Sequence, residues 1–447
     1  MGQTMKSIRK RLQQTALLAT IVLCAAAAAA CIEYLRRGGD MAALADAVLR
    51  TAQGEGMPRA SRGDVRWEMD WSGAWDSTQS LQSWVVERFR PAPADDGPIL
   101  PAVAAPGIAT PDGSLPDIIV PDTFETTIIE PDFDAAVQVY FAPVRPGAAE
   151  GIKRVLLELI AGAQESVLVA AFNLGHEGIA DALIEAHRSG LRVGIVSDSD
   201  YREQEAMQRV LAAGIEVRFD ERSAFMHNKF VIVDSHTVWT GSTNLTNNGF
   251  FVNRNNAVVL RSPELAANFT VEFQEMFRDG LFGPRSPPGV PHPVLHVGPT
   301  QVRTLFAPED DVISVITGEL ARARTHIDFM AYAFSCEDIA GAMAQGLDRG
   351  LAVRGLFERI HAGRDWSRDD YLAARGAQVF VCASPGKMHH KVIVIDRELV
   401  VTGSYNFSRN AAQSNDENVV LLRNAEIAGR FVDELDRLVL EATEGPV

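Results

Sequence analysis

Two histidine–lysine pairs in the same sequence setting are the residues with the clearest chemical potential. Six positions recur with an offset of 162 residues: His227, Lys229, Asp234, Gly241, Ser242 and Asn244 return as His389, Lys391, Asp396, Gly403, Ser404 and Asn406. In a strand, residues two apart project to the same face, so each histidine points the same way as its lysine. Residues 135–440 contain four lysines, and two of them occupy these equivalent places.

Two histidines and two lysines around one point suit an anionic tetrahedral centre. Displacement at phosphorus needs an attacking group and a leaving-group acid roughly in line. One neutral imidazole can attack and form a phosphohistidine, while the other, protonated, donates to the leaving oxygen. The lysines, with Asn244 and Asn406, are expected to hold the non-bridging oxygens. Ser242 and Ser404 are also expected to bind the substrate. This chemistry requires no metal or other cofactor, and no metal-ligand spacing is visible.

The remaining motif residues concern the backbone around these pairs. Gly241 and Gly403 are expected to permit a tight turn that lets phosphate approach main-chain amides. Asp234 and Asp396 end their strands. They either orient the catalytic groups electrostatically or cap the turn, and both interpretations stay open.

An internal repeat extends well beyond the motif. Phe141-Ala142-Pro143 returns as Phe306-Ala307-Pro308, and Ala171-Phe172 is interpreted as returning in Ala333-Phe334. Within copy one, hydrophobic periodicity predicts helices at 152–160, 179–188 and 203–211 and strands at 167–172, 192–196, 215–219, 230–233 and 238–240.

Alternating helical and strand periods indicate an α/β fold. We predict two tandem α/β-sandwich lobes with mixed sheets, covered on both faces and related by a pseudo-twofold axis. Lobe 1 is expected at 135–282 and lobe 2 at 300–440, with the Pro- and Gly-rich stretch 283–299 between them. A pseudo-twofold pairing of the copies within one chain predicts activity as a monomer.

The composition is that of a soluble globule with one apolar segment. The chain has 447 residues, of which 47% are hydrophobic and 22% are charged, and its net charge is −16. Such a charge disfavours a broad nucleic-acid-binding surface, so a polyanion has to be attracted by a local site.

The N-terminal 1–36 predict a signal peptide or a membrane anchor. Basic residues precede an apolar run at 15–32, which is typical of both. Cys31 after three alanines is similar to a lipoprotein acylation site. A membrane anchor or lipoprotein, a cleaved signal and an internal helix are the alternatives, and the first two place the protein outside the cytoplasm, in the periplasm or cell envelope if it is bacterial.

Two further segments precede the repeat. Residues 37–90 carry Trp67, Trp71 and Trp75 at intervals of four, which indicates either a helix at a membrane interface or a segment docked on the main domain. Residues 91–134 contain nine acids and no Lys or Arg. With nine prolines between 91 and 131, this stretch predicts an extended acidic linker.

Both copies match the pattern HxK(x)4D(x)6GSxN at every defined position, and the chain from about 137 to 440 therefore resembles the phospholipase D superfamily. The resemblance implies a two-lobed α/β fold, a phosphohistidine intermediate and metal-independent phosphodiester cleavage or transfer. It implies that His227 and His389 are the catalytic pair, with Lys229 and Lys391 on the phosphate.

One departure from the family pattern makes the halves unequal. Family members often carry an acidic residue downstream of each motif that supports the histidine. Copy two has Glu417, which is expected to support His389, whereas copy one has Asn255 instead. A carboxylate on His389 favours that residue as nucleophile. Family precedent favours the first histidine, so the sequence leaves the roles open.

Three other features admit two interpretations each. His390 is expected to pack rather than to react, and Cys336 and Cys382 are expected to be buried free thiols rather than a disulfide. The stretch around 359–366 has no close counterpart in copy one and is either a substrate contact or a solvated surface; its candidate residues are Arg359, His361, Arg364 and Trp366.

The function that best fits these features is a membrane-anchored phosphodiesterase that hydrolyses or transfers a phospholipid head group at a membrane surface, in lipid catabolism. The alternatives are an extracytoplasmic nuclease of the same superfamily, a phosphatidyltransferase similar to cardiolipin synthase, and an inactive binding scaffold. Intact motifs in both copies disfavour the scaffold, and the acidic charge disfavours the nuclease.

Overall fold

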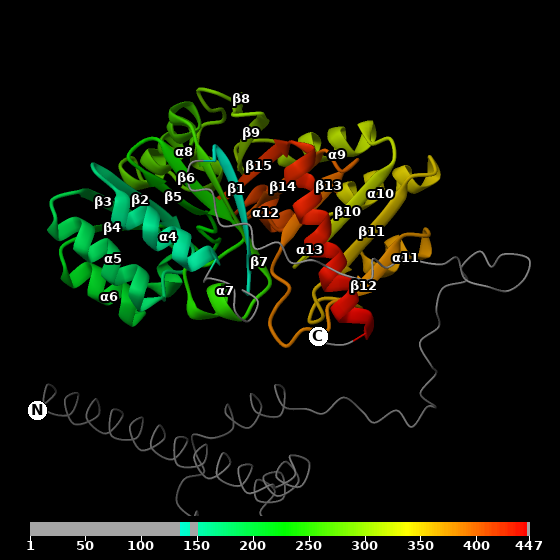
Figure 1. Cartoon of the computed structure of the whole chain (residues 1–447), viewed down its shortest axis with the longest axis horizontal. Coiled ribbons are helices and arrows are strands. Elements are labelled where there is room, and N and C mark those ends of the chain that lie inside the picture. Colours follow the sequence, from blue (N-terminus) through cyan, green and yellow to red (C-terminus); the bar gives the residue numbers. More distant parts are fainter. Residues whose placement is uncertain (1–134, 144–150, 445–447) are drawn as a thin grey trace, which may run out of the picture. The chain divides into compact units, whose positions relative to one another are not determined.

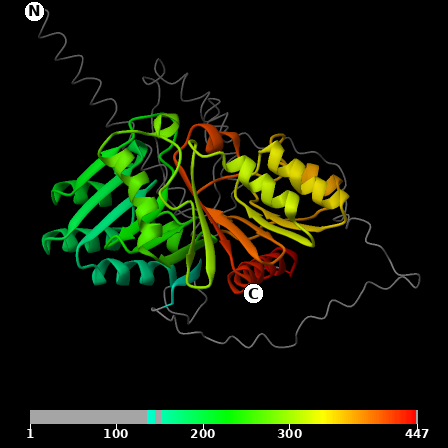
Figure 2. The same cartoon turned by 90° about the horizontal axis from the view of Figure 1, so that it is seen from above.

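The computed structural model describes residues 135–143 and 151–444, which belong to one compact unit. Two lobes lie side by side in it, lobe 1 in cyan to green and lobe 2 in yellow to red (Figures 1 and 2). The expected anchor, Trp-containing segment and acidic linker all lie outside these residues. Among the described helices, none has the length and apolar character needed to cross a membrane.

Lobe 1 is a seven-stranded mixed sheet with helices, in the order β1-β7-β6-β5-β2-β3-β4. β2, β3 and β4 are parallel to one another, and the other pairs are antiparallel. Its strands are β1 (Val137–Ala142), β2 (Ser166–Ala171), β3 (Arg192–Ser197), β4 (Glu216–Phe219), β5 (Lys229–Val233), β6 (Thr237–Gly241) and β7 (Asn255–Arg261). Its helices are α4 (Gly151–Gly162), α5 (Glu177–Arg188), α6 (Glu205–Ala212), α7 (Asn247–Phe251) and α8 (Pro263–Phe277), with a 3₁₀ turn η2 (Ser199–Tyr201).

Lobe 2 repeats this plan with one extra edge strand, in the order β12-β11-β10-β13-β14-β15-β9-β8. Its strands are β8 (Val294–Val297), β9 (Thr300–Ala307), β10 (His326–Ala331), β11 (Ala352–Phe357), β12 (Gln378–Val381), β13 (Lys391–Ile395), β14 (Leu399–Gly403) and β15 (Glu417–Arg423). Its helices are α9 (Val312–Arg322), α10 (Glu337–Asp348), α11 (Asp369–Ala374), α12 (Arg409–Gln413) and α13 (Ala425–Glu444), and the 3₁₀ turn η3 (Gly283–Arg285) precedes the lobe. The predicted α/β class and mixed sheets are confirmed.

Local sequence explains why the elements form where they do. β5 and β13 are buried at every position, as expected for continuous apolar runs covered on both faces. α8 begins after Ser262, whose hydroxyl accepts from the amide of Leu265, and Pro263 takes the first turn, where its missing N–H costs nothing.

A shared core joins the lobes. One hydrophobic cluster contains buried residues from both sheets and from α8 and α13, while each lobe also has an outer cluster of its own. Phe431 of α13 packs edge-on against Phe141 of β1, with ring centroids 5.2 Å apart. α13 in red lies against the lobe 2 sheet in Figure 1. The lobes are therefore packed as one body, which fixes the relative position of the two motifs.

The structure corrects one repeat alignment. Phe172 donates its amide hydrogen to Asn228 O, 3.1 Å away, and Tyr332 donates its own to His390 O, 2.9 Å away. Phe172 is therefore matched by Tyr332, not by Phe334 as the shared Ala-Phe dipeptide suggested. The Phe-Ala-Pro match is confirmed, since Phe141 pairs with Asn256 and Phe306 with Asn418.

Candidate active site

Each histidine–lysine pair lies at the start of a central strand. Lys229 opens β5 and Lys391 opens β13, and each histidine comes two residues earlier. Both lysines are at most 2% exposed, and each amino group donates to the carbonyl oxygen of its own histidine at 2.7 Å. The alternation of strand side chains therefore brings each pair together, as predicted.

Backbone contacts across the lobes bring the two pairs to one place. The amide of His227 donates to Asp416 O in lobe 2 at 2.9 Å, and the amide of His389 donates to Arg254 O in lobe 1 at 2.8 Å. The side-chain amide of Asn256 in lobe 1 donates to Thr402 Oγ1 in lobe 2 at 2.8 Å. In the same way, the side-chain amide of Asn418 in lobe 2 donates to Thr240 Oγ1 in lobe 1 at 2.7 Å. These exchanged contacts are the pseudo-twofold relation expected from the repeat.

Glu417 supports the histidine of the other lobe. Its Oε2 lies 2.7 Å from Nδ1 of His227 and 2.6 Å from the hydroxyl of Ser404. Asn415 donates to the second carboxylate oxygen at 3.0 Å. The expectation that Glu417 supports His389 is therefore wrong, because the strand that follows each motif faces the opposite motif across the lobe boundary.

An uncharged side chain takes the equivalent place beside His389. Nδ1 of His389 lies 2.9 Å from Asn255 Oδ1 and 3.0 Å from Ser242 O. Asn255 is held in this orientation, since its amide donates to Gly249 O and the hydroxyl of Ser242 donates to its Oδ1, both at 2.9 Å. Both neighbours of Nδ1 are acceptors, so Nδ1 carries a hydrogen and Nε2 is left for chemistry.

The electrostatics of the site favour an anionic ligand. Burial lowers the pKa of Lys229 to about 7, although Glu417 and Asp198 oppose this. Burial and the charge of Lys229 lower the pKa of Lys391 well below its ordinary value. Within the described residues neither lysine forms an ion pair with a carboxylate. A phosphodiester anion placed between them would relieve both effects.

Both histidines are predominantly neutral near pH 7 in the free protein. Burial, partly offset by the Glu417 carboxylate, lowers the pKa of His227 to about 4. Burial and then the charges of Lys391 and Lys229 lower the pKa of His389 well below its ordinary value. A neutral imidazole has the lone pair that a nucleophile needs.

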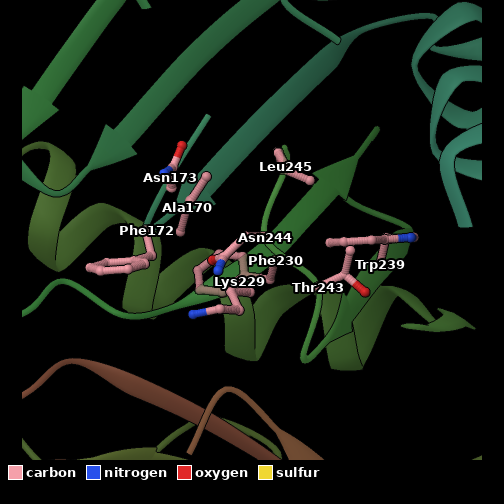
Figure 3. Close-up of a pocket in the computed structure, with 10 residues that line it drawn as sticks. Ala170, Phe172, Asn173, Lys229, Phe230, Trp239, Thr243, Asn244 and Leu245 are labelled. Carbon is pink, nitrogen blue, oxygen red and sulfur yellow. The ribbon is translucent and has the colours of Figure 1, made fainter. Parts of the chain in front are cut away.

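A small recess beside the first pair holds another predicted residue. Lys229, Asn244 and Phe172 are among the residues that line this recess in lobe 1. Figure 3 shows the amino group of Lys229 extending toward the Phe172 side, with Asn244 close to it. The side-chain Oδ1 atoms of Asn244 and of Asn406 have no hydrogen-bond partner among the described residues.

Asp234 and Asp396 lie at the far end of the strands from the histidines. The Asp234 carboxylate accepts from the backbone amides of residues 164, 165 and 166 at 2.8 to 2.9 Å. Asp396 accepts in the same way from residues 324, 325 and 326. Four strand residues separate each aspartate from its histidine–lysine pair, so the capping interpretation accounts for their contacts.

The glycines and serines of the motif position their neighbours. A Cβ on Gly241 would lie 2.4 Å from Asn256 O, and the φ of Gly241 is +145°. Gly403 has the same environment beside Asn418 O. These glycines make room for the adjacent strand, not for phosphate, whereas Ser242 and Ser404 hold the residues that support the histidines.

The structure also resolves two of the secondary features. His390 is fully buried, its Nδ1 lies 3.1 Å from Asn256 Oδ1, and its Nε2 faces Glu434 at 3.6 Å. Cys336 and Cys382 are buried free thiols among the described residues. Both expectations are confirmed.

The sequence interpretation missed the aromatic residues that pack on the histidines. Phe172 lies edge-on to His227 and Tyr332 edge-on to His389, with ring centroids 4.8 and 4.7 Å apart. Phe172 directly follows β2 and Tyr332 directly follows β10, so the two rings are equivalent. The sequence alignment of Phe172 with Phe334 hid this equivalence.

A group of three carboxylates lies apart from the motif residues. The oxygens of Glu272, Glu275 and Glu309 lie within 4.8 Å of one another. Burial raises the pKa of Glu309 to about 8 and that of Glu275 to about 7, and raises that of Glu272 well above its ordinary value. These groups therefore keep protons near neutral pH and do not present a fully charged cation site.

Comparison with known proteins agrees with this geometry. A family model described as "Cardiolipin synthase, PLD-like domain" matches residues 156–277 and 316–439, which is more than half of the chain and falls on both lobes. The chain belongs to the phospholipase D superfamily. It is a phosphodiesterase of the phospholipase D type.

The individual relatives align with a stretch of this phospholipase D family chain that is about as long as one lobe. A phospholipase D of Rickettsia bellii is 31% identical over 147 residues, which are 33% of this chain and 73% of that protein. A mitochondrial cardiolipin hydrolase of Chlamydomonas reinhardtii is 32% identical over 123 residues, 27% of this chain and 55% of that protein. A phosphatidylserine synthase structure from Haemophilus influenzae is 13% identical with a TM-score of 0.54, covers 69% of this chain and 88% of that one, and shows the fold alone.

Proposed function

We propose that the protein hydrolyses or transfers the head group of a phospholipid by two displacements at phosphorus, with His227 as nucleophile and His389 as acid. The observation that carries the assignment is the unequal support of the two Nδ1 atoms, Glu417 on one and Asn255 on the other. Attack by His227 creates a positively charged phosphoimidazolium, which a carboxylate stabilises and an amide does not.

In the first displacement, the Nε2 lone pair of His227 forms the P–N bond and the bond from phosphorus to the leaving oxygen breaks. Binding of the phosphodiester anion raises the pKa of His389, and its Nε2, protonated in that complex, gives its proton to the leaving oxygen. Lys229 and Lys391 offset the charge on the non-bridging oxygens. In the second displacement His389 takes a proton from water or an alcohol, the new P–O bond forms, and the P–N bond breaks.

Lipid is proposed as the substrate because the named relatives include phospholipase D and cardiolipin hydrolase and because the chain is strongly acidic. Transfer to an alcohol is the second candidate, favoured by the description of the matching family model. We also propose that the chain acts as a monomer, since it carries both motifs, and that residues 15–32 direct it out of the cytoplasm, as an anchor or as a signal. Membrane fractionation of cells and light scattering of the purified protein test these two points.

The test incubates the full-length protein with phosphatidylcholine, cardiolipin or single-stranded DNA, with and without EDTA. Lipid turnover that EDTA does not change supports the proposal, and glycerol added as acceptor distinguishes transfer from hydrolysis by its product. DNA cleavage with inert lipids would contradict the proposal in favour of a nuclease. The double variant His227→Ala/His389→Ala serves as the control for contaminating activity.

A further inference from the structure

The inner walls of the active site are alike in the two lobes. Phe172 and Tyr332 pack edge-on to the two histidines, as described above. The amino group of Lys229 lies 5.0 Å from the centroid of the Phe172 ring, and that of Lys391 lies 4.8 Å from the centroid of Tyr332. Any chemical difference between the two sides therefore comes from residues farther out.

The next residues on each side differ in charge. Tyr201 packs on Phe172 in lobe 1, and His361 packs on Tyr332 in lobe 2, both with centroids 4.8 Å apart. Two residues before each histidine, lobe 1 has Phe225 and lobe 2 has Lys387.

These two residues also contact equivalent rings. Phe225 lies 5.2 Å from the Phe172 ring, and the Lys387 amino group lies 5.8 Å from the Tyr332 ring. The His227 side is therefore lined by neutral aromatic groups, whereas the His389 side carries a cation.

Further cations gather on the His389 side. Burial, followed by the charges of Lys387, Arg364 and Lys391, lowers the pKa of His361. Trp366 lies 5.2 Å from His361 and is 41% exposed, so this wall is open to solvent.

The carboxylates nearest to these cations are hydrogen-bonded to backbone amides. The oxygens of Glu358 accept from the backbone amides of Ile360 and Met388, and Asp369 accepts from Gly363 at 2.7 Å. Asp365 is the single acid in 359–366, which also contains Arg359 and Arg364. Arg359, Arg364 and Lys387 are matched in number by Glu358, Asp365 and Asp369, so the positive charge that meets the Tyr332 ring is local and comes from Lys387.

The geometry of in-line displacement indicates which part of the substrate contacts the residues on the His389 side. If His227 attacks, the leaving oxygen lies on the opposite side of phosphorus, next to His389. The leaving alcohol, which is the lipid head group, then contacts the residues around Tyr332. This step rests on the function proposed above.

We propose that Tyr332, His361, Arg364, Trp366 and Lys387 form the leaving-group site and select phospholipids whose head group carries a phosphate over those whose head group ends in a quaternary ammonium. A phosphate on the head group meets Lys387 and Arg364, which complement its charge. A quaternary ammonium binds well to an aromatic face that is free of other cations. The Tyr332 ring already has Lys387 and Lys391 against it, so a choline group meets like charge there.

The test measures kcat/KM of the full-length protein on cardiolipin and on phosphatidylcholine, each presented in mixed micelles with a neutral detergent. Cleavage of bis(p-nitrophenyl) phosphate, which has no such head group, normalises for the amount of folded enzyme. The variants are Lys387→Phe, which copies the lobe 1 residue, and Lys387→Gln combined with Arg364→Gln. Arg192→Gln removes an exposed cation at the start of β3 and is the matched control.

We expect the wild-type enzyme to prefer cardiolipin, and the ratio of the two kcat/KM values to fall roughly fivefold to tenfold in the double variant, as for the loss of two exposed charge pairs. Lys387→Phe lowers the ratio by a smaller factor, and Arg192→Gln leaves it as in the wild type. Added salt should reduce the wild-type ratio more than that of the double variant, because exposed charges are screened.

A wild-type preference for phosphatidylcholine, or ratios that neither variant changes, would overturn this inference while leaving the proposed function in place. Should the double variant fail to fold, Lys387→Phe and the wild-type salt dependence still decide. Cleavage of single-stranded DNA with no lipid turnover would overturn both the inference and the proposed function.

Discussion

At the scale of single residues, the two histidines proposed as catalytic differ in what each Nδ1 atom contacts. Glu417 places a buried carboxylate at 2.7 Å from one, and Asn255 places an amide oxygen at 2.9 Å from the other. The two histidines occupy equivalent places in the lobes, yet His227 is suited to carry positive charge whereas His389 gives up its proton readily. This difference makes the pH dependence of the enzyme a test of the assignment.

A carboxylate beside His389 should move the alkaline limb of the pH profile. Burial, and then the positive charges of Lys391 and Lys229, hold the pKa of His389 low, so kcat/KM is expected to fall as pH rises and His389 loses its proton. Asn255→Asp favours the imidazolium and raises the pKa of His389, so we expect this limb to move to higher pH by roughly one to two pH units.

The measurement is kcat/KM against pH for a small phosphodiester. Asn247→Asp, an exposed change at the start of α7, serves as the control and should keep the wild-type profile. An unchanged profile in Asn255→Asp would show that His389 is not the group that must be protonated.

Residue types and spacing were sufficient to predict that each histidine lies beside its lysine and that the two pairs share one place, because the motif occurs twice with one offset. They did not reveal which histidine Glu417 supports. Glu417 follows His389 by 28 positions in the chain, yet it lies beside the histidine of the first lobe because the amide of His227 pairs with Asp416. That pairing depends on how the lobes dock, which no local pattern records.

At the scale of elements, the motif aspartates fasten the turn after each central strand to the segment before β2 or β10. Burial raises the pKa of Asp234, but the backbone amides of Ser166, Gln164 and Glu165 more than offset this, so its pKa is lowered. A lowered pKa means that the stabilisation is present above the unfolded pKa and is lost as pH falls through the folded value.

Asp234→Asn should therefore lower stability rather than catalysis. We expect the free energy of unfolding to fall by about 1 to 3 kcal/mol, as for lost hydrogen bonds to a charged group, with kcat of the folded fraction nearly retained. Urea denaturation at neutral pH measures the first quantity, and Glu185→Gln on the exposed surface of α5 is the control. If a stable Asp234→Asn protein lost kcat by orders of magnitude, Asp234 would act on the catalytic groups rather than cap the turn.

The strands and helices of each lobe follow their sequence periodicity closely, since β5, β13 and their neighbours are continuous apolar runs. The equivalence of Tyr332 with Phe172 could not be predicted from the sequence. The Ala-Phe dipeptide of lobe 2 is Ala333-Phe334, two residues beyond Ala331-Tyr332. Hydrogen-bond register, not residue identity, decides which ring packs on His389.

At the scale of the whole molecule, the shared cluster between the sheets makes the two lobes one folding unit. Phe431 belongs to lobe 2 by sequence, yet it packs against Phe141 of β1 in lobe 1. The site depends on this packing, because its two halves come from different lobes. Composition and repeat length indicated two lobes but carried no information on α8 and α13 filling the space between them.

Phe431→Ala should destabilise both lobes together. We expect the free energy of unfolding to fall by about 3 to 5 kcal/mol, as for other large-to-small changes in a core, in one transition. Hydrogen exchange should then increase in β2 and β5 of lobe 1 as well as in α13. The exposed change Phe251→Ala is the control, and faster exchange confined to lobe 2 would show that the lobes fold independently.

The most direct measurement is the identity of the residue that becomes phosphorylated. A labelled phosphodiester with a p-nitrophenyl leaving group needs no proton from an acid, so His389→Ala should still form the covalent intermediate. It should then accumulate it, because His389 is absent as the base for the second displacement. We expect mass spectrometry to find the label on His227 in His389→Ala and on no residue in His227→Ala. Label on His389 in the His227→Ala protein, with none on His227 in the other variant, would contradict the account.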